Sequence, residues 1–230
     1  MTNTQKAEGP HYHPRGMVEV KKIWHTFQGE GPYQGHPAIF IRLAGCNLEC
    51  PGCDTEYTQD RKLCNPGYIV MKCNELAPSS QTSLVVITGG EPFRQNIVPL
   101  VNQLFLSGYD VQIETNGTLF IENLPYPKLT IVCSPKTPKI NPDLEPHIDY
   151  WKYVLDADHV DKEDGLPTSV LGLNLKPARP HPESDVPIYV QPMDSHDEEQ
   201  TNKNAAATIN SCIKHNYRIS IQLHKILGLE

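Results

Sequence analysis

Short apolar runs, each followed by a polar or glycine-rich turn, recur along the chain and predict a set of β-strands. The first run, residues 17–25, alternates apolar and polar residues and is typical of a half-exposed strand. The later runs are rich in Val, Ile and Leu, as in the buried strands of a parallel sheet. We expect these strands at residues 37–45, 83–88, 110–114, 129–133, 150–155, 188–191 and 218–223.

Helical periodicity is rarer than strand-like patterning. Residues 93–107 carry apolar side chains at helical spacing and are followed by Gly108, which favours a helix end. We expect a short helix within residues 68–76, and another that ends near His215 with Asp194 or Ser195 as its N-cap. Because strands outnumber helices, the pattern indicates an α/β fold, an incomplete parallel (β/α) barrel with reduced helical cladding. Strand faces left bare by the missing helices predict burial by a second subunit.

The length of 230 residues suits one domain with a sizeable core. Residues 1–16 show no apolar periodicity, so we expect them to form a flexible N-terminal extension. The single domain is then predicted to occupy residues 17–230.

Charge and composition narrow the function classes. The net charge of −7 argues against binding to nucleic acid, which requires clustered Lys and Arg, and favours a small-molecule substrate. No apolar run approaches the roughly 20 residues that span a bilayer, so no membrane association is expected. The seven cysteines are odd in number and three crowd into one loop, which predicts reduced thiols and a cytoplasmic location.

The cysteine loop directly follows the strand-like residues 37–45. Its three cysteines, Cys46, Cys50 and Cys53, can hold three corners of a 4Fe-4S cluster and leave one iron open to a small molecule. A structural zinc site is the alternative, because Cys64 or Cys73 could supply the fourth ligand that zinc needs. The spacing alone leaves both readings open.

Other motifs are ambiguous when read from the residues alone. FQGEG at residues 27–31 can be an ordinary polar turn or a backbone that approaches a ligand. Arg42 interrupts a buried strand, where a charge is costly without a partner, so it either pairs with Glu30 or extends to the rim. TGGEP at residues 88–92 follows a buried strand and can be a structural turn or a ligand-binding loop.

The cysteine triplet followed by Asp54 and Thr55 resembles the signature of radical S-adenosylmethionine (SAM) enzymes. QGEG before the triplet, and TGGEP, ETNGT, SPK, QPM and a terminal HK after it, occur in the order seen in the 7-carboxy-7-deazaguanine synthase family. The resemblance extends from about residue 18 to the C-terminus. It implies a carbon–nitrogen lyase that converts 6-carboxy-5,6,7,8-tetrahydropterin to 7-carboxy-7-deazaguanine with loss of ammonia, in queuosine-type deazapurine biosynthesis.

The resemblance also implies ligands for particular residues. The cluster would be held by Cys46, Cys50 and Cys53, and Mg²⁺ by Thr55 with the substrate carboxylate. SAM contacts are implied for Gly52, Asp54, Gly90, Glu91, Ser134, Pro135, Lys136 and Gln191. Pterin contacts are implied for Phe27, Gln28, Gly29, Glu30, Arg42, Thr88 and His224.

By the same resemblance, the radical is carried by SAM, so no side chain is expected to act as a catalytic group. A flavodoxin or ferredoxin would supply the electron, and the family is dimeric. Two alternatives remain. An activating enzyme for a glycyl-radical protein shares the triplet and TGGEP but does not require QGEG, and a noncatalytic zinc-binding module would be colourless where a cluster protein is brown.

Overall fold

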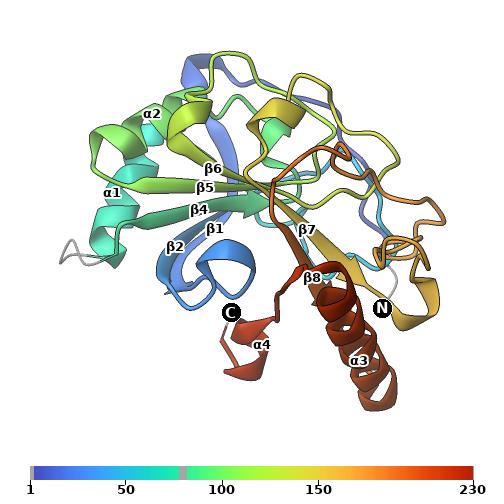
Figure 1. Ribbon diagram of the computed structural model, residues 1–230. Helices are drawn as coiled ribbons and strands as arrows, with labels where there is room; N and C mark the ends of the chain where they lie inside the picture. The colour runs from blue at the N-terminus through green and yellow to red at the C-terminus, as the bar shows by residue number, and fades with distance from the viewer. Residues whose placement is uncertain (1–2, 78–81, 230) are drawn as a thin grey trace.

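The computed structural model describes residues 3–77 and 82–229, which form one open, twisted sheet with helices against part of it (Figure 1). The nine strands of the sheet are ordered β3-β1-β2-β4-β5-β6-β7-β8-β9. Strands from β2 to β9 run parallel, and β1 pairs antiparallel with both β2 and β3. The sheet ends at β3 and β9 and does not close, which agrees with the predicted incomplete barrel.

The strand bounds follow the apolar runs closely in the middle of the chain and less well at its ends. They are β1 Val18–Phe27, β2 Pro37–Leu43, β3 Lys62–Cys64, β4 Leu84–Gly89, β5 Asp110–Thr115, β6 Leu129–Cys133, β7 Tyr150–Leu155, β8 Ile188–Pro192 and β9 Arg218–Ile219. The prediction missed β3, which is too short to show a period. It also overextended the last strand, because the chain turns after Ile219 and forms a helical turn from Leu223.

Four α-helices accompany the sheet. They are α1 Pro66–Leu76, α2 Val98–Leu106, α3 Glu198–His215 and α4 Leu223–Ile226. α2 begins later than predicted, because a separate 3-10 turn occupies Pro92–Arg94. The N-cap of α3 is Asp197, whose side chain accepts a hydrogen bond from the Gln200 amide, so the prediction of Asp194 or Ser195 was wrong.

The two faces of the sheet differ in character because neighbouring residues of a strand point to opposite sides. One face is apolar and packs with α1 and α2 in the main core. Its strand residues include Ile39, Ile41, Val85, Ile87, Val111, Ile113, Ile131, Trp151 and Tyr153. The alternate positions carry polar side chains on the other face, namely Arg42, Thr88, Gln112, Glu114, Lys152 and Gln191. We call this second face the polar face.

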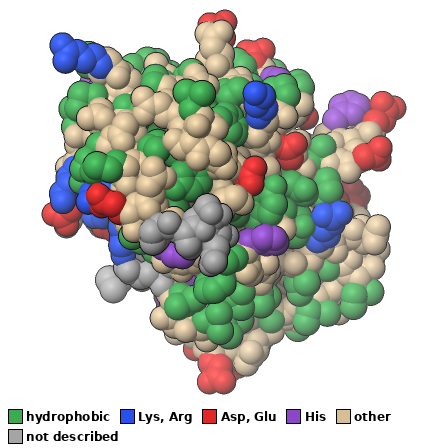
Figure 2. Space-filling view, turned by 90° about the vertical axis from the view of Figure 1, so that its left-hand side faces the viewer, with side chains coloured by type: hydrophobic (Ala, Val, Ile, Leu, Met, Phe, Trp, Pro, Cys, Tyr) green, Lys and Arg blue, Asp and Glu red, His purple; other side chains and the backbone are tan. Residues whose placement is uncertain are grey.

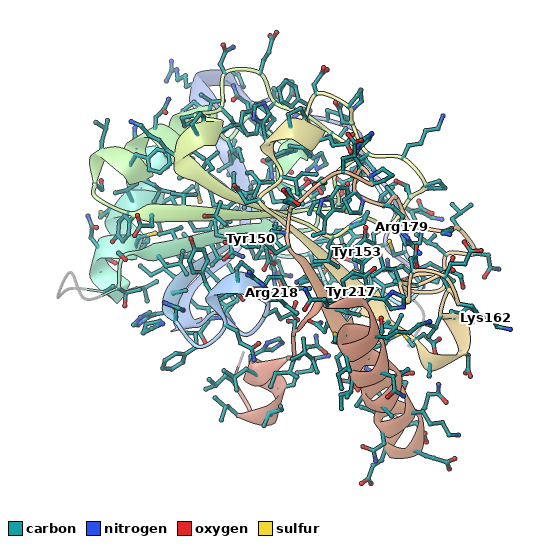
Figure 3. The ribbon with its side chains drawn as sticks, viewed as in Figure 1. Tyr150, Tyr153, Lys162, Arg179, Tyr217 and Arg218 are labelled. Atoms are coloured by element: carbon teal, nitrogen blue, oxygen red, sulfur yellow. The ribbon has the colours of Figure 1, made fainter. Side chains whose placement is uncertain are left out.

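The long segment between β7 and β8 forms no α-helix, yet it covers part of the apolar face. Its Arg179 lies 5.6 Å from the ring centre of the buried Tyr153 and donates a 2.7 Å hydrogen bond to Asp164. The Tyr217 hydroxyl in turn donates to the Asp164 carbonyl at 2.8 Å. Figure 3 shows Arg179, Tyr153 and Tyr217 grouped beside β7 and α3. Side-chain contacts here replace the helix that a complete barrel would have.

Residues 3–17 lie across the cysteine loop and do not project from the domain. The Asn3 amide donates to the Pro51 carbonyl, and the Glu8 amide to the Cys46 carbonyl, both at 2.7 Å. The Gln5 side chain bridges the loop, donating to the Thr55 carbonyl at 2.8 Å and accepting from the Tyr57 amide at 2.7 Å. The flexibility expected for residues 1–16 stays a prediction, as does the single domain over 17–230.

A buried arginine anchors this segment to the sheet. The Arg94 guanidinium is 2% exposed, and its Nη2 lies 2.8 Å from Glu19 Oε2 and 3.4 Å from Glu8 Oε2. It also donates to the Ala44 carbonyl just before the cysteine loop. None of the described helices combines the length and apolar character needed to cross a membrane.

We expect Arg94→Met to lower the free energy of unfolding by about 2 kcal/mol, because it removes a buried guanidinium that pairs with Glu19 and donates to the Ala44 carbonyl, while Arg61 still pairs with both carboxylates. Urea unfolding followed by circular dichroism measures the effect. Lys72→Met, which removes an exposed i,i+3 pair with Glu75, is the matched control and should leave unfolding unchanged. Equal stabilities for the two variants would contradict the role given to Arg94.

Candidate functional site

The cysteine loop and the TGGEP loop lock together where β2 and β4 end. The Gly90 amide donates to the Leu43 carbonyl at 3.2 Å, and the Glu91 amide to the Gly45 carbonyl at 2.9 Å. A Cβ atom at position 90 would lie 2.1 Å from the Gly45 carbonyl oxygen and 2.9 Å from the Cβ of Cys46. Only glycine fits at position 90, and the two motifs therefore form one surface.

The three cysteines of the loop are free thiols held in a partly buried setting. Cys50 is 7% exposed, and Cys46 and Cys53 are half-buried. Burial raises the pKa of Cys46 to about 12 and also raises the pKa of Cys50 and Cys53. The positive charge of Lys136 opposes this rise in pKa at Cys50 and Cys53. Lys136 therefore favours the thiolate form of these two cysteines, which is the form that binds iron.

The cysteine set fits a cluster better than a closed zinc site. Cys64 and Cys73 lie in the apolar core, so neither is available as a fourth ligand to the loop. A closed structural zinc site needs four protein ligands, and the cysteine loop supplies three. A cubane spreads its thiolates over separate irons.

Glu91 is fully buried and ties two loops together. Its carboxylate accepts hydrogen bonds from the Thr115 hydroxyl at 2.8 Å and from the amides of Asn116 at 2.7 Å and Phe93 at 2.9 Å. Burial raises the pKa of Glu91 even though these three donors favour the ionised form. With its oxygens used internally, Glu91 leaves the backbone of the glycines as the part of TGGEP that faces a ligand.

SPK follows β6 and faces the same end of the sheet. The Lys136 ammonium donates to the Ser134 carbonyl at 2.6 Å and to its hydroxyl at 2.7 Å. Burial lowers the pKa of Lys136.

A cavity of about 570 Å³ opens beside Pro51 and Gly52. The side chains of Asp156, His159, Ser169, Asn174 and Met193 line its far side. None of these five was assigned a ligand from the sequence.

A connected set of polar side chains occupies the polar face next to the FQGEG turn. The Lys152 ammonium is paired with Glu30 and lies 4.0 Å from Glu114 Oε1. Glu114 accepts hydrogen bonds from Gln28 at 3.1 Å and from the Thr88 hydroxyl at 3.0 Å. The structure thus brings together Gln28, Glu30 and Thr88, which the sequence assigned to the pterin. Arg42 and Glu30 do not pair, because Lys152 takes that place.

Gln191 also joins this set. Its side-chain amide donates to Glu30 at 3.2 Å, and its oxygen accepts from the Ser220 hydroxyl at 3.2 Å. Gln222 donates to the same carboxylate oxygen of Glu30 at 3.0 Å. The resemblance assigned Gln191 to SAM, whereas the structure places it beside the residues assigned to the pterin.

His224 lies directly on the FQGEG turn. The Leu223 amide donates to the Gly29 carbonyl at 3.0 Å, and a Cβ atom at position 29 would lie 2.2 Å from Nδ1 of His224. The neighbouring Lys225 lies 3.6 Å from Asp54 and 3.0 Å from Asp194. The C-terminal HK motif therefore joins the FQGEG turn to the cysteine loop.

Arg42 and Thr55 remain open toward ligands. The Arg42 guanidinium lies 5.0 Å from the ring centre of Trp24, and its buried Nε has no hydrogen-bond partner among the described residues. The Thr55 hydroxyl donates to the Asp54 carboxylate at 3.3 Å. Phe27, at the start of the turn, is 43% exposed, and Pro135, the middle residue of SPK, is buried.

Sequence reasoning missed Lys152, Glu114 and Gln222. Glu114 stands in the quoted ETNGT motif, but a motif does not say which of its side chains faces the site. Lys152 was detectable in principle, since in YWKYVL it lies out of phase with the core residues Trp151 and Tyr153. Gln222 lies beyond the last strand and shows no signal of its own.

Comparisons with known proteins agree with this geometry. The family "4Fe-4S single cluster domain" matches residues 27–121. A protein of Rhodospirillum rubrum named 7-carboxy-7-deazaguanine synthase is 40% identical over the whole of both chains. The protein of that name from Rickettsia prowazekii is 40% identical over 93% of this chain and 89% of its own. The crystal structure of QueE from Escherichia coli matches with a TM-score of 0.66 at 23% identity, over 90% of this chain and 95% of that one, which shows the shared fold.

An open α/β barrel with a three-cysteine cluster loop at the carboxyl ends of its strands defines a radical SAM enzyme, with a 4Fe-4S cluster and SAM as cofactors. Within that class, the identity to the Rhodospirillum and Rickettsia proteins is decisive. The chain belongs to the 7-carboxy-7-deazaguanine synthase family.

We expect Gln5→Ala to loosen the cysteine loop, because Gln5 satisfies both the Thr55 carbonyl and the Tyr57 amide. Loss of hydrogen bonds worth about 1 kcal/mol each should speed exchange of the Tyr57 amide hydrogen about 5- to 10-fold. Hydrogen–deuterium exchange measures this directly. Lys6→Ala changes an exposed neighbour and is the control. If both variants exchange at the wild-type rate, the segment does not hold the loop.

Proposed function

We propose that this enzyme converts 6-carboxy-5,6,7,8-tetrahydropterin to 7-carboxy-7-deazaguanine with loss of ammonia. The observation that supports this most is the polar set around Glu30, Glu114 and Lys152 beside a loop of three free cysteines. A flat, polar heterocycle needs donors and acceptors in one plane, and this set supplies both next to the cluster loop. The relatives that bear the synthase name cover the full chain.

Cys46, Cys50 and Cys53 would hold the cluster, and the open iron would bind SAM. When bound, the reduced cluster and SAM would supply radical chemistry, namely reversible hydrogen abstraction from the substrate. The chain's own task is to position the reactants and exclude water. We assign SAM contacts to the backbone of Gly52, Gly90 and Glu91, and to Asp54, Ser134, Pro135 and Lys136. The cavity beside Gly52 is large enough for its nucleoside.

On the pterin side, we assign contacts to Phe27, Gln28, Gly29, Glu30, Arg42, Thr88 and His224, and we add Gln191. The orphaned Nε of Arg42 suits the substrate carboxylate, because a guanidinium fork binds a carboxylate with two parallel hydrogen bonds. Carboxylates and amides from Glu30, Gln28 and Gln191 suit the hydrogen-bonding edge of the heterocycle.

We assign Mg²⁺ to Thr55, with the substrate carboxylate and water as its other oxygen ligands. A threonine hydroxyl is a weak neutral ligand, so the ion would enter with the substrate and not before it. Bound there, it would orient the carboxylate and withdraw charge from the ring.

We also propose two protein partners, an electron donor and a second copy of the chain. A flavodoxin or ferredoxin would reduce the cluster in the cytoplasm, where thiols stay reduced. A second copy of the chain would cover exposed apolar side chains, among them Ile226 and Leu227 of the C-terminal segment, which are 68% and 56% exposed. Figure 2 shows apolar side chains gathered in the lower part of one face, at the level of α4 in Figure 1.

The decisive experiment is anaerobic turnover of the carboxytetrahydropterin with SAM, dithionite and Mg²⁺. We expect the deazaguanine product and ammonia, with far less than one methionine per product because SAM is re-formed. Stoichiometric SAM cleavage without this product would favour an activating enzyme for a glycyl-radical protein. A colourless protein with one bound zinc ion would favour the noncatalytic module.

Replacing Cys46, Cys50 or Cys53 by Ala should abolish both the brown colour and turnover, since each thiolate holds a different iron. Anaerobic iron and sulfide analysis after reconstitution measures the first effect. Cys212→Ala, on α3 and outside the loop, is the control and should bind iron like the wild type. Full cluster content in any of the three loop variants would contradict the assignment.

Arg42→Met should raise KM for the carboxytetrahydropterin about 10- to 100-fold, because it removes charge-assisted hydrogen bonds to the carboxylate. The affinity for SAM should not change. Arg15→Met removes an exposed guanidinium and serves as the control. An unchanged KM in Arg42→Met, measured at saturating SAM, would show that Arg42 does not bind the substrate.

A further inference from the structure

Lys152 is a buried cation in the middle of a central strand. It is 7% exposed and lies on β7 between Trp151 and Tyr153, both of which point into the apolar core on the opposite face. Its ammonium is paired with Glu30, which comes from the turn after β1, and lies 4.0 Å from Glu114 on β5. A single side chain therefore connects three separate parts of the polar face.

Burying an ammonium costs several kcal/mol that its partners must offset, and an apolar residue of similar volume usually stabilises a fold as well or better. Stability alone therefore does not explain why a lysine occupies this position. What lysine adds is a fixed positive charge between two carboxylates. Lys152, Glu30 and Glu114 together combine one basic and two acidic side chains, so acceptor groups outnumber the cation on the polar face.

The charged state of the group follows from its surroundings. Burial alone would raise the pKa of Glu30, but the Lys152 ammonium and the Gln222 amide lower it below its usual value. Burial alone would lower the pKa of Lys152, but Glu30 and Glu114 raise it well above its usual value. Glu30 and Lys152 therefore both stay ionised, and Glu30 acts only as a hydrogen-bond acceptor.

The hydrogen bonds show which carboxylate oxygens of Glu30 and Glu114 can still accept a hydrogen bond from a ligand. Glu30 Oε1 already accepts from Gln191 and Gln222, while its other oxygen binds Lys152. Glu114 Oε1 accepts from Gln28 and Gln112. Glu114 Oε2 accepts from the Thr88 hydroxyl at 3.0 Å, so Glu114 Oε2 and Glu30 Oε2 each retain one lone pair for a donor of the ligand.

We propose that Lys152 is a positioning residue that holds Glu30 and Glu114 as a fixed pair of carboxylate acceptors, which select a heterocycle bearing an amino group beside a ring N–H. This inference rests on the proposed function and deepens it. The 2-amino group and N3–H of a pterin are two such donors on one edge. A 2-oxo analogue presents a carbonyl oxygen there, which the carboxylates reject because the acceptors then face each other unpaired.

The test measures equilibrium binding to the reconstituted, SAM-loaded protein. The probes are 6-carboxypterin and 6-carboxylumazine, its 2-oxo counterpart, both followed by their own fluorescence. We expect the wild type to prefer the pterin strongly. Lys152→Met should reduce that preference about 10- to 100-fold, since it misaligns charge-assisted hydrogen bonds, while SAM affinity stays the same. Lys152→Arg retains the charge and should restore much of the preference.

Lys152→Met leaves two buried carboxylates without their cation and can fail to fold. The double variant K152M/E30Q removes one carboxylate with the cation and should fold, yet still lose the preference. Lys72→Met, on the exposed side of α1, is the control for the loss of a lysine.

The outcomes separate the two proposals. If the wild type binds neither probe, the proposed function itself fails. If the wild type prefers the pterin and K152M/E30Q prefers it equally, Lys152 has no part in selection and this inference is overturned. A parallel loss of SAM affinity in the Lys152 variants would also overturn it, because that result indicates a general structural role. Loss of preference alone, with rescue by Arg, supports the inference.

Discussion

The structure depends on one constraint, the two-residue alternation of side chains along strands that pair in register. Because β2, β4, β5 and β7 keep this register, their odd-numbered core residues such as Ile41 and Ile113 share one face. The alternate positions then fall on the other face, where Arg42, Thr88, Glu114 and Lys152 lie. A single pattern thus builds the core and the polar face together.

The open sheet leaves that surface accessible, and the two ends of the chain complete it. The N-terminal segment bonds to the cysteine loop through Asn3, Gln5 and Glu8. The C-terminal turn places His224 on Gly29 and Lys225 beside Asp54. Segments far apart in sequence therefore meet at one site: the N-terminal segment contacts the cysteine loop, and the C-terminal turn contacts both that loop and the FQGEG turn.

Much of this arrangement was predictable from the sequence, because its signals are local. The cysteine spacing, the glycines of TGGEP and the Val- and Ile-rich strands each show their structure within a few residues. Lys152 was missed because a lysine in a strand is ordinarily exposed, and its burial depends on Glu30 from a distant turn. The position of residues 3–17 was missed because hydrogen bonds and ion pairs hold them, and such contacts leave no apolar pattern in the sequence. β3 was missed because its three residues are too few to show a period. Asp197 was missed because Asp194 and Ser195 nearby are equally good N-cap residue types.

The central claim is that three thiolates of one loop hold a 4Fe-4S cluster whose fourth iron is open to SAM. Electron paramagnetic resonance of the dithionite-reduced, reconstituted protein tests it directly, because the signal of a reduced cluster responds to the ligands of its irons. The account predicts a cluster signal whose g-values shift when SAM is added. A signal that SAM leaves unchanged, or a protein that takes up one zinc ion and gives no signal, would contradict it.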